Sequence, residues 1–294
     1  MTRSVPVKAR STEPTFAVAF GGGGARGLAH IHVIEALDEL GIRPVAIAGS
    51  SIGAIMGAAM AAGMKGAEIN AFARSVLERP SSVATRMWST RPGSVREALE
   101  RGLRFGQFDV ERIVKAFVPE QVPDTFEALD IPLVCTATDY YAHAPTIFYS
   151  GDLNSALAAS AAIPGIFRPV TRNGRLYVDG GFYDPVPFDI LEGKADIIIA
   201  VDVVGAPLEG AKRPTTVELI YGASQLMMQS IIAAQLKHHR APDIFLRPAV
   251  SRFRVLDFLK YGQIMRETAP IKDELKRAVE KRLARYDREP PKGS

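Results

Sequence analysis

The sequence has 294 residues, of which 47% are hydrophobic and 23% charged, and its formal net charge is +4 with a pI of about 9.2. A chain of this length can bury roughly three quarters of its unfolded surface, and this composition is ordinary for a soluble globular protein. The single cysteine excludes an internal disulfide and favours a reducing compartment, and no apolar run reaches the ~18 residues that a membrane span needs.

The first elements predicted along the chain alternate between strand and helix. They are a strand at 15–20, a helix at 28–40, a strand at 45–48 and a helix at 52–62. Gly41 and Gly63 follow the two helices, where glycine favours termination. This order predicts a parallel sheet that is covered by helices on both faces.

The segment 79–108 is less regular and is expected to be a surface loop with helical pieces. Its aromatic residues Trp88, Phe105 and Phe108 could form a lid or an acyl channel, although ordinary packing is the more common role. The later predicted elements are helices at 109–118, 153–162, 214–238 and 271–287, strands at 131–138, 146–149, 195–204 and 243–246, and a hairpin of 167–170 with 175–178 around Asn173-Gly174.

No internal repeat or low-complexity linker divides the chain, so we expect a single α/β domain over residues 14–288. Residues 1–13 are expected to form a disordered lead-in and 289–294 a flexible tail. The N-terminal stretch lacks the apolar core of a secretory signal, which favours a cytoplasmic protein. The positive charge is mild and no nucleic-acid motif is present, so we expect no nucleic-acid partner.

A serine on a sharp strand-to-helix turn is the first candidate functional group. Ser51 has glycines two positions before and two positions after it, Gly49 and Gly53. Residues at these positions crowd the strained turn of a nucleophile elbow, so glycine suits both. The helix predicted from residue 52 also directs its positive end at Ser51. Ser50 has the wrong spacing, and the competing interpretation is a glycine-rich helix start with a capping serine.

The glycine run before the first predicted helix admits two interpretations. It comprises Gly22, Gly23, Gly24, Ala25, Arg26 and Gly27. As an oxyanion hole, it would bring backbone N–H groups close to a tetrahedral oxygen. As a dinucleotide-binding loop, it would require an acidic residue at the end of the second strand, where the chain has Ser50 and Ser51 instead. The first interpretation is therefore favoured. Arg26 either braces this loop or contacts a phosphate.

A serine nucleophile needs a base, and none of the histidines lies in a segment that clearly closes on Ser51. The histidines are His30, His32, His143, His238 and His239. His30 and His32 are two positions apart on a predicted helix and so cannot share a face. His238 and His239 end a long predicted helix among basic residues, which is typical of a solvated cap.

Asp179 is the alternative base. It ends a predicted strand and precedes two glycines, Gly180 and Gly181, that allow close packing. An aspartate ordinarily titrates near 3.9, but burial beside a serine makes it more basic. A Ser–Asp pair can then do the work of a triad. The competing interpretation is an ordinary turn, because Asp-Gly is common there.

Together these blocks resemble those of the patatin-like phospholipases, the bacterial branch in particular. The resemblance covers about two thirds of the chain, from Phe16 to Val204, with the glycine, serine and aspartate blocks in the family's order. The stretch 159–169 is similar to the family's segment ahead of the aspartate. The resemblance implies a three-layer α/β/α sandwich with a mostly parallel central sheet, a Ser51–Asp179 catalytic dyad, an oxyanion hole at residues 22–27, and neither metal nor organic cofactor.

The implied activity is hydrolysis of fatty-acyl esters of phospholipids, lysophospholipids or related lipids. An acyltransferase that uses the same serine is the alternative, and a dinucleotide-binding protein or a non-catalytic membrane-interaction protein is more remote. A histidine-triad α/β-hydrolase is disfavoured because the serine turn follows the second predicted strand, which is too early. Segments 79–108 and 205–294 carry no family motif, so the sequence specifies neither head group, chain length nor oligomeric state.

The predicted C-terminal helix has an apolar face. Ile271, Leu275, Val279 and Leu283 recur along it. We expect this face to dock on the protein's own core, and peripheral contact with a membrane surface is the alternative.

Overall fold

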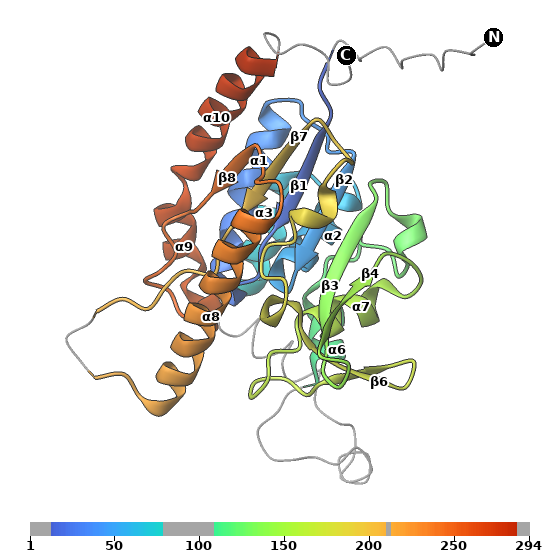
Figure 1. Cartoon of the computed structure of the whole chain (residues 1–294), viewed down its shortest axis with the longest axis vertical. Coiled ribbons are helices and arrows are strands. Elements are labelled where there is room, and N and C mark those ends of the chain that lie inside the picture. Colours follow the sequence, from blue (N-terminus) through green and yellow to red (C-terminus); the bar gives the residue numbers. More distant parts are fainter. Residues whose placement is uncertain (1–12, 79–108, 210–212, 287–294) are drawn as a thin grey trace.

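The computed structural model describes residues 13–78, 109–209 and 213–286 (Figure 1). Its strands are β1 (Phe16–Phe20), β2 (Ala46–Ser50), β3 (Leu133–Asp139), β4 (Ala144–Phe148), β5 (Val170–Arg172), β6 (Arg175–Asp179), β7 (Ile197–Val201) and β8 (Ile244–Leu246). They form one sheet in the order β5-β6-β3-β2-β1-β7-β8, and β4 pairs with β3 beside this path.

The helices of the described ranges are α1 (His30–Glu39), α2 (Ile52–Ala61), α3 (Gly66–Leu77), α6 (Val110–Phe117), α7 (Leu153–Ser160), α8 (Thr216–His238), α9 (Tyr261–Thr268) and α10 (Ile271–Tyr286). A 3-10 helix at Gly24–Ala29 leads into α1. Within the described ranges, none of these helices is long and apolar enough to cross a membrane.

The sheet is parallel at its centre and antiparallel at one edge. β1 pairs in parallel with β2 and with β7, and the parallel series continues to β3 on one side and β8 on the other. β4 and β6 both pair with β3 in antiparallel fashion, and β5 pairs with β6 likewise. The prediction of a mostly parallel central sheet is confirmed.

Side chains alternate between the two faces of the sheet along each strand, and both faces are buried. Phe16, Val18 and Phe20 of β1 join the larger core, which also contains residues of α1, α2, α3, α7, α9 and α10. Ala17 and Ala19 face the other way, into a smaller core. This second core is closed by residues 186–191 and by Ile232 of α8. The three-layer α/β/α architecture is therefore confirmed, with a thin second layer.

Most predicted elements are present with shifted ends. The hairpin is confirmed, because Asn173 and Gly174 have φ values of 51° and 73°, as this tight turn requires. Its first strand was placed too early, since β5 begins only at Val170. Two helices, α3 and α9, were missed. The segment 79–108 with its three aromatic residues, the lead-in up to residue 12 and the tail from 287 lie outside the described residues.

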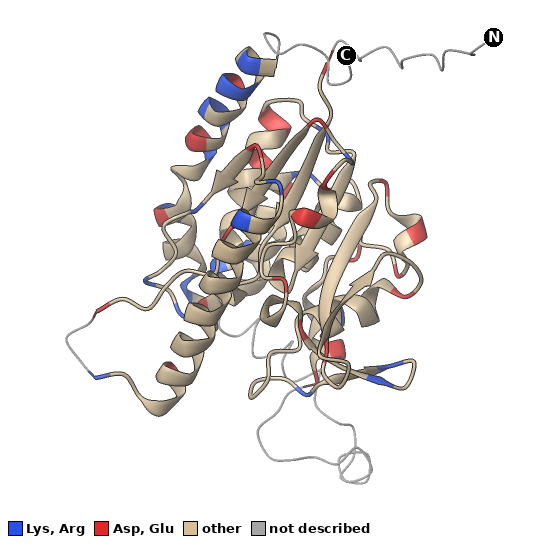
Figure 2. Cartoon of the chain, viewed as in Figure 1, with Lys and Arg blue, Asp and Glu red and all other residues tan. Residues whose placement is uncertain are grey.

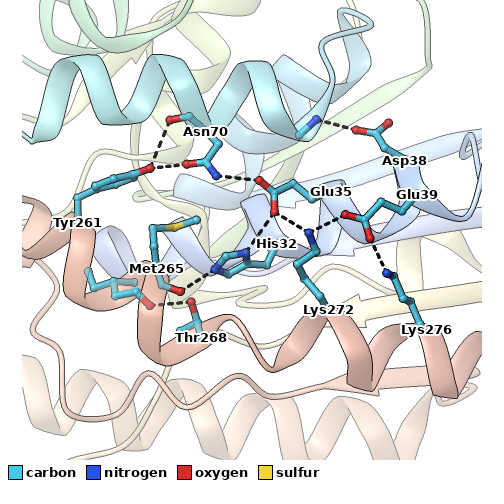
Figure 3. A network of polar contacts seen from close by, with 12 residues as sticks. His32, Glu35, Asp38, Glu39, Asn70, Tyr261, Met265, Thr268, Lys272 and Lys276 are labelled. Carbon is cyan, nitrogen blue, oxygen red and sulfur yellow. Dashed lines mark hydrogen bonds and ion pairs between the residues drawn. The ribbon is translucent and has the colours of Figure 1, made fainter.

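The C-terminal helix docks on the protein's own core, as expected. Ile271, Leu275 and Val279 are buried against the larger core. Polar contacts add to this packing (Figure 3): Lys272 Nζ donates to Glu35 Oε2 at 3.1 Å and to Glu39 Oε1 at 2.7 Å, which ties α10 to α1.

Candidate active site

The three sequence blocks meet at the carboxyl ends of the central strands. The glycine run 21–24 follows β1, Ser51 follows β2, and Asp179 ends β6. Because β1 and β2 are parallel neighbours, the segments that leave them lie side by side. This edge of an α/β sheet is where such folds usually bind ligands.

Ser51 occupies a strained turn. Its φ of 54° and ψ of −125° place it outside the ordinary conformations of a residue with a side chain. A Cβ at Gly53 would collide with the carbonyl of Phe20, and one at Gly49 would collide with the backbone of Ala54. The two glycines of the predicted elbow are therefore required by close approach of the backbone.

A second serine fixes the backbone of this turn. The Ser51 N–H donates to Ser160 Oγ at 2.8 Å, and both residues are buried. Ser160 ends α7, 109 positions away in sequence, so this bond anchors the elbow to the other half of the domain. Ser160 was not among the residues predicted for the site, because a bond between distant segments leaves no local pattern in the sequence.

The structure brings Ser51 and Asp179 into direct contact. Ser51 Oγ donates to Asp179 Oδ2 at 2.6 Å, and both side chains are almost completely buried. The other carboxylate oxygen, Oδ1, accepts from the Gly181 N–H at 2.8 Å. A Cβ at Gly180 would collide with the carbonyl of Thr136, so this glycine permits the close packing of the aspartate turn.

The surroundings of Asp179 make it a stronger base than an ordinary aspartate. Burial raises its pKa from 3.8 to about 6, against the opposing effect of the hydrogen bonds from Ser51 and Gly181. Within the described ranges no lysine or arginine pairs with this carboxylate. At neutral pH it is therefore ionised and able to accept a proton from the hydroxyl that it contacts.

Two amides of the glycine run already have partners. The N–H of Gly22 donates to Pro185 O and that of Ala25 donates to Val255 O. The N–H groups of Gly23 and Gly24 have no acceptor among the residues that the structure describes. Arg26 and Gly27 lie further along the 3-10 helix. Of the donors expected at residues 22–27, Gly23 and Gly24 are therefore the candidates with a free amide beside the pocket.

A third amide comes from the serine turn itself. Ile52 is the first residue of α2, and its N–H has no acceptor in the described part of the chain. The amide that follows a nucleophilic serine commonly contributes to an oxyanion hole, and the N-terminus of a helix favours negative charge. Gly27 supports this arrangement differently, since a Cβ there would collide with the Ile52 side chain.

Arg26 contacts both sides of the glycine turn. Its Nε donates to Gly23 O at 3.1 Å and its Nη1 donates to Val204 O. Burial lowers its pKa to about 10, with Asp202 and Asp257 acting in the opposite direction. These contacts to backbone carbonyls are those of a brace, one of the two roles considered from the sequence.

A pocket opens beside Ser51. Its polar part consists of the glycine turn, Arg26, Ser51 and Asp179. Its remaining wall is largely apolar and comes from several segments: Ile163, Phe182, Val204, Tyr221, Met228 and Val255. Apolar walls around one polar corner suit a substrate with a hydrocarbon chain and a single reactive group.

No histidine of the described residues lines the pocket or bonds to Ser51. His30 is fully buried, with Nε2 at 2.8 Å from Gly21 O, and burial lowers its pKa to about 4. His32 Nε2 lies 2.8 Å from Met265 O, and His143 is exposed in the turn between β3 and β4. His238 and His239 are exposed at the end of α8, as expected. Ser50, the rival nucleophile, is buried and its Oγ has no partner in the described part of the chain.

The described ranges contain no group of three or more His, Cys, Asp or Glu side chains arranged to hold a metal ion. The groups around the pocket suit acyl transfer. They are the Ser51 hydroxyl, the Asp179 carboxylate in contact with it, and free backbone amides beside the same pocket.

Comparisons with known proteins find relatives over most of the chain. A family model described as patatin-like phospholipase matches residues 18–192. An uncharacterized NTE family protein of Mycobacterium tuberculosis is 38% identical over 213 residues, which cover 71% of this chain and 55% of that protein. A lysophospholipase, nte1, of Aspergillus fumigatus is 27% identical over 277 residues, covering 84% of this chain and 17% of that protein.

Among solved structures, VipD from Legionella pneumophila aligns with a TM-score of 0.43 and 17% identity, over 81% of this chain and 60% of that chain. The present chain thus spans about half the length of the mycobacterial relative and a smaller share of the fungal one.

Proposed function

This chain belongs to the patatin-like phospholipase family, and we propose that it is a serine hydrolase that cleaves fatty-acyl esters of phospholipids, lysophospholipids or related lipids. The observation that carries the proposal is the contact of 2.6 Å between Ser51 Oγ and Asp179 Oδ2. The raised pKa of Asp179 and the apolar pocket support it.

In the proposed first step, Asp179 Oδ2 takes the proton of the Ser51 hydroxyl while Oγ attacks the ester carbonyl carbon. The carbonyl oxygen becomes an oxyanion that the N–H groups of Gly23, Gly24 and Ile52 stabilise. Loss of one such donor typically costs roughly 3–4 kcal/mol of transition-state stabilisation.

Collapse of the intermediate breaks the bond to the alcohol oxygen. Asp179 returns its proton to this leaving group, and the acyl chain remains on Ser51 as an ester. Water then attacks the acyl-serine, with Asp179 again taking the proton, and the fatty acid leaves with Ser51 restored. The hydrogen bond from the Gly181 N–H holds the carboxylate in place through both halves of the cycle.

The test is labelling with a fluorophosphonate probe together with turnover of a short-chain nitrophenyl ester. We expect the unmodified protein to label and to turn over, and Ser51→Ala to do neither. Ser50→Ala is the matched control, because it removes a hydroxyl one residue away that makes no contact with Asp179. Labelling that survives Ser51→Ala but not Ser50→Ala would overturn the assignment of the nucleophile.

A second measurement defines the acyl acceptor. Water is the acceptor in our proposal, so addition of a competing alcohol is expected to leave free fatty acid as the main product. Transfer of most of the acyl group to that alcohol would instead identify an acyltransferase.

A further inference from the structure

Helix α8 differs from an ordinary surface helix because its large apolar side chains lie on all sides of it and few charges accompany them. Of its 23 residues, only Ile232 is buried. Figure 2 shows that the helix is almost uncharged along its length, in contrast to α10, and the sequence gives it one acidic residue, Glu218, and one lysine, Lys237. Large apolar side chains on more than one side of a helix are expected to be covered on more than one side.

The inner face of α8 forms one wall of the pocket. Tyr221, Gln225 and Met228 line the same pocket as Ser51, and Met228 lies close to Gly181. Gln225 Nε2 donates to Val204 O at 3.0 Å, so this part of the helix is attached to the same segment that Arg26 contacts. The position of α8 is thereby tied to the mouth of the pocket.

The outer face of α8 is exposed. In its N-terminal half, five large aliphatic side chains are between 57% and 65% exposed: Val217, Leu219, Ile220, Leu226 and Met227. In the C-terminal half the exposed residues are small or polar, namely Ser230, Ala233, Ala234, Lys237 and His238. The aliphatic side chains are thus concentrated in the half of the helix that contributes to the pocket.

Neighbouring segments extend this surface. Leu208 and Leu256 are 63% and 52% exposed. Pro207 lies against Gly222 of α8, and Arg254 pairs with Glu218, so both leucines are next to residues that contact the N-terminal half of the helix. We call the five aliphatic residues of α8 together with these two leucines the α8 patch. Contiguous apolar surface of this kind marks an interaction site.

Long charged side chains border the α8 patch, mostly as ion pairs. Arg252, Arg254 and Lys260 flank Leu256 and are exposed, and they pair with Glu267, Glu218 and Asp257 respectively. Arg213 precedes α8 and Glu209 follows Leu208, and both are exposed. The border thus has no large excess of charge, and arginine and lysine at the edge of aliphatic side chains can reach the phosphates of a lipid surface while their stems lie among its acyl chains.

We propose that the N-terminal half of α8 inserts into the surface of a phospholipid bilayer and that lipid passes from there into the pocket along Tyr221 and Met228. A second protein molecule seated on the α8 patch would cover the pocket mouth, whereas a bilayer would supply the substrate through it. This inference rests on the proposed function for the identity of the substrate, and the binding that it predicts is measurable without any hydrolysis.

The experiment measures flotation with vesicles of ether-linked phosphatidylcholine, with and without ether-linked phosphatidylglycerol, because ether lipids cannot be hydrolysed by an esterase. The test variant carries Leu219→Gln, Leu226→Gln and Met227→Gln, which keep side-chain length and helix propensity. The control carries Leu40→Gln, Val45→Gln and Ile147→Gln, three exposed aliphatic residues on other elements.

We expect the unmodified chain and the control to bind vesicles and the test variant to bind at least tenfold more weakly, with an unchanged rate on a soluble nitrophenyl ester. Vesicle binding that is equal in the test variant, or absent from the unmodified chain, overturns the inference. A molar mass in solution that falls from dimer to monomer in the test variant also overturns it, because a second copy then occupies the patch.

The two proposals fail in different ways. Ester turnover without vesicle binding contradicts the membrane inference alone. Vesicle binding that requires the α8 patch in a chain without ester turnover supports the docking surface and contradicts the proposed function.

Discussion

Asp179 and Glu35 are both carboxyl groups within polar clusters of the same fold, yet their surroundings shift their pKa values in opposite directions. Burial raises the pKa of Asp179 to about 6. Burial also acts to raise the pKa of Glu35, but hydrogen bonds from Asn70, Lys272 and His32 and the charge of Lys272 outweigh it and lower that pKa below 4.5. Burial therefore dominates at Asp179, whereas at the partly buried Glu35 the hydrogen-bonding and charged partners outweigh it.

Figure 3 shows how the partners of Glu35 are arranged. Its Oε1 accepts from Asn70 Nδ2 at 2.7 Å and its Oε2 accepts from Lys272 Nζ at 3.1 Å, so α3 and α10 converge on one residue of α1. A carboxylate held by a cation stays ionised and serves to join helices. Asp179, whose partners are a hydroxyl and an amide, retains the ability to take up a proton.

The largest expected effect is a loss of ester turnover when Asp179, but not Glu35, is replaced by its amide. In Asp179→Asn, the amide oxygen can accept from the Gly181 N–H, but the amide nitrogen then donates to Ser51 Oγ, and no group takes the hydroxyl proton. We expect turnover of a nitrophenyl ester to fall by about 10³-fold or more. Glu35→Gln is the matched control and is expected to keep near-normal turnover. Near-normal turnover of Asp179→Asn would return a histidine to consideration as the base.

Asp179→Asn, which is expected to lose activity, is expected to gain stability. Between pH 3.8 and about 6, folded Asp179 holds a proton that the unfolded chain has released, so this residue lowers the free energy of unfolding as the pH rises. A shift of about two units corresponds to roughly 3 kcal/mol above pH 6. Urea unfolding should therefore find Asp179→Asn more stable than the unmodified chain at pH 7, by up to that amount, and little different at pH 4.

The pH dependence of turnover gives a smaller and more direct measure. The base must be deprotonated, so kcat/KM on a soluble ester is expected to fall about tenfold for each pH unit below about 6 and to be level above it. Glu35→Gln should leave this acidic fall of kcat/KM unchanged. If kcat/KM of the unmodified chain fell only below about pH 4, burial would not raise the pKa of the base, and the contrast with Glu35 would be lost.

The parts of this site that could be predicted from the sequence are those marked by glycines at fixed short spacings from a functional residue. Gly49 and Gly53 lie two positions on either side of Ser51, and Gly180 follows Asp179 directly. This spacing is visible in a single sequence, although the atoms that require glycine at 53 and 180, the carbonyls of Phe20 and Thr136, lie on other strands. The catalytic roles of Ser51 and Asp179 and the boundaries of the single domain remain predictions.

The parts that were missed depend on contacts between distant segments. Ser160 meets Ser51 across 109 positions, and the occupied amides of Gly22 and Ala25 are bonded to segments that follow Asp179 in sequence. The sequence did not show which side of α8 lines the pocket. Its large apolar residues lie on all sides of the helix, so their spacing does not distinguish the pocket wall from the outer surface.

The smallest expected effect tests the structural side of the comparison. A double-mutant cycle of Glu35→Gln with Lys272→Met should give a coupling free energy of about 1 kcal/mol, because both side chains are largely shielded from water. The exposed pair of Arg43 with Asp130 is the control and should give a value near zero. Since the folded pKa of Glu35 is lowered, its contribution is present above pH 4.5 and is lost as the pH falls further. If Lys272→Met instead reduced ester turnover at unchanged stability, the cluster would act on the glycine loop through α1, and the separation between a catalytic and a structural carboxylate would fail.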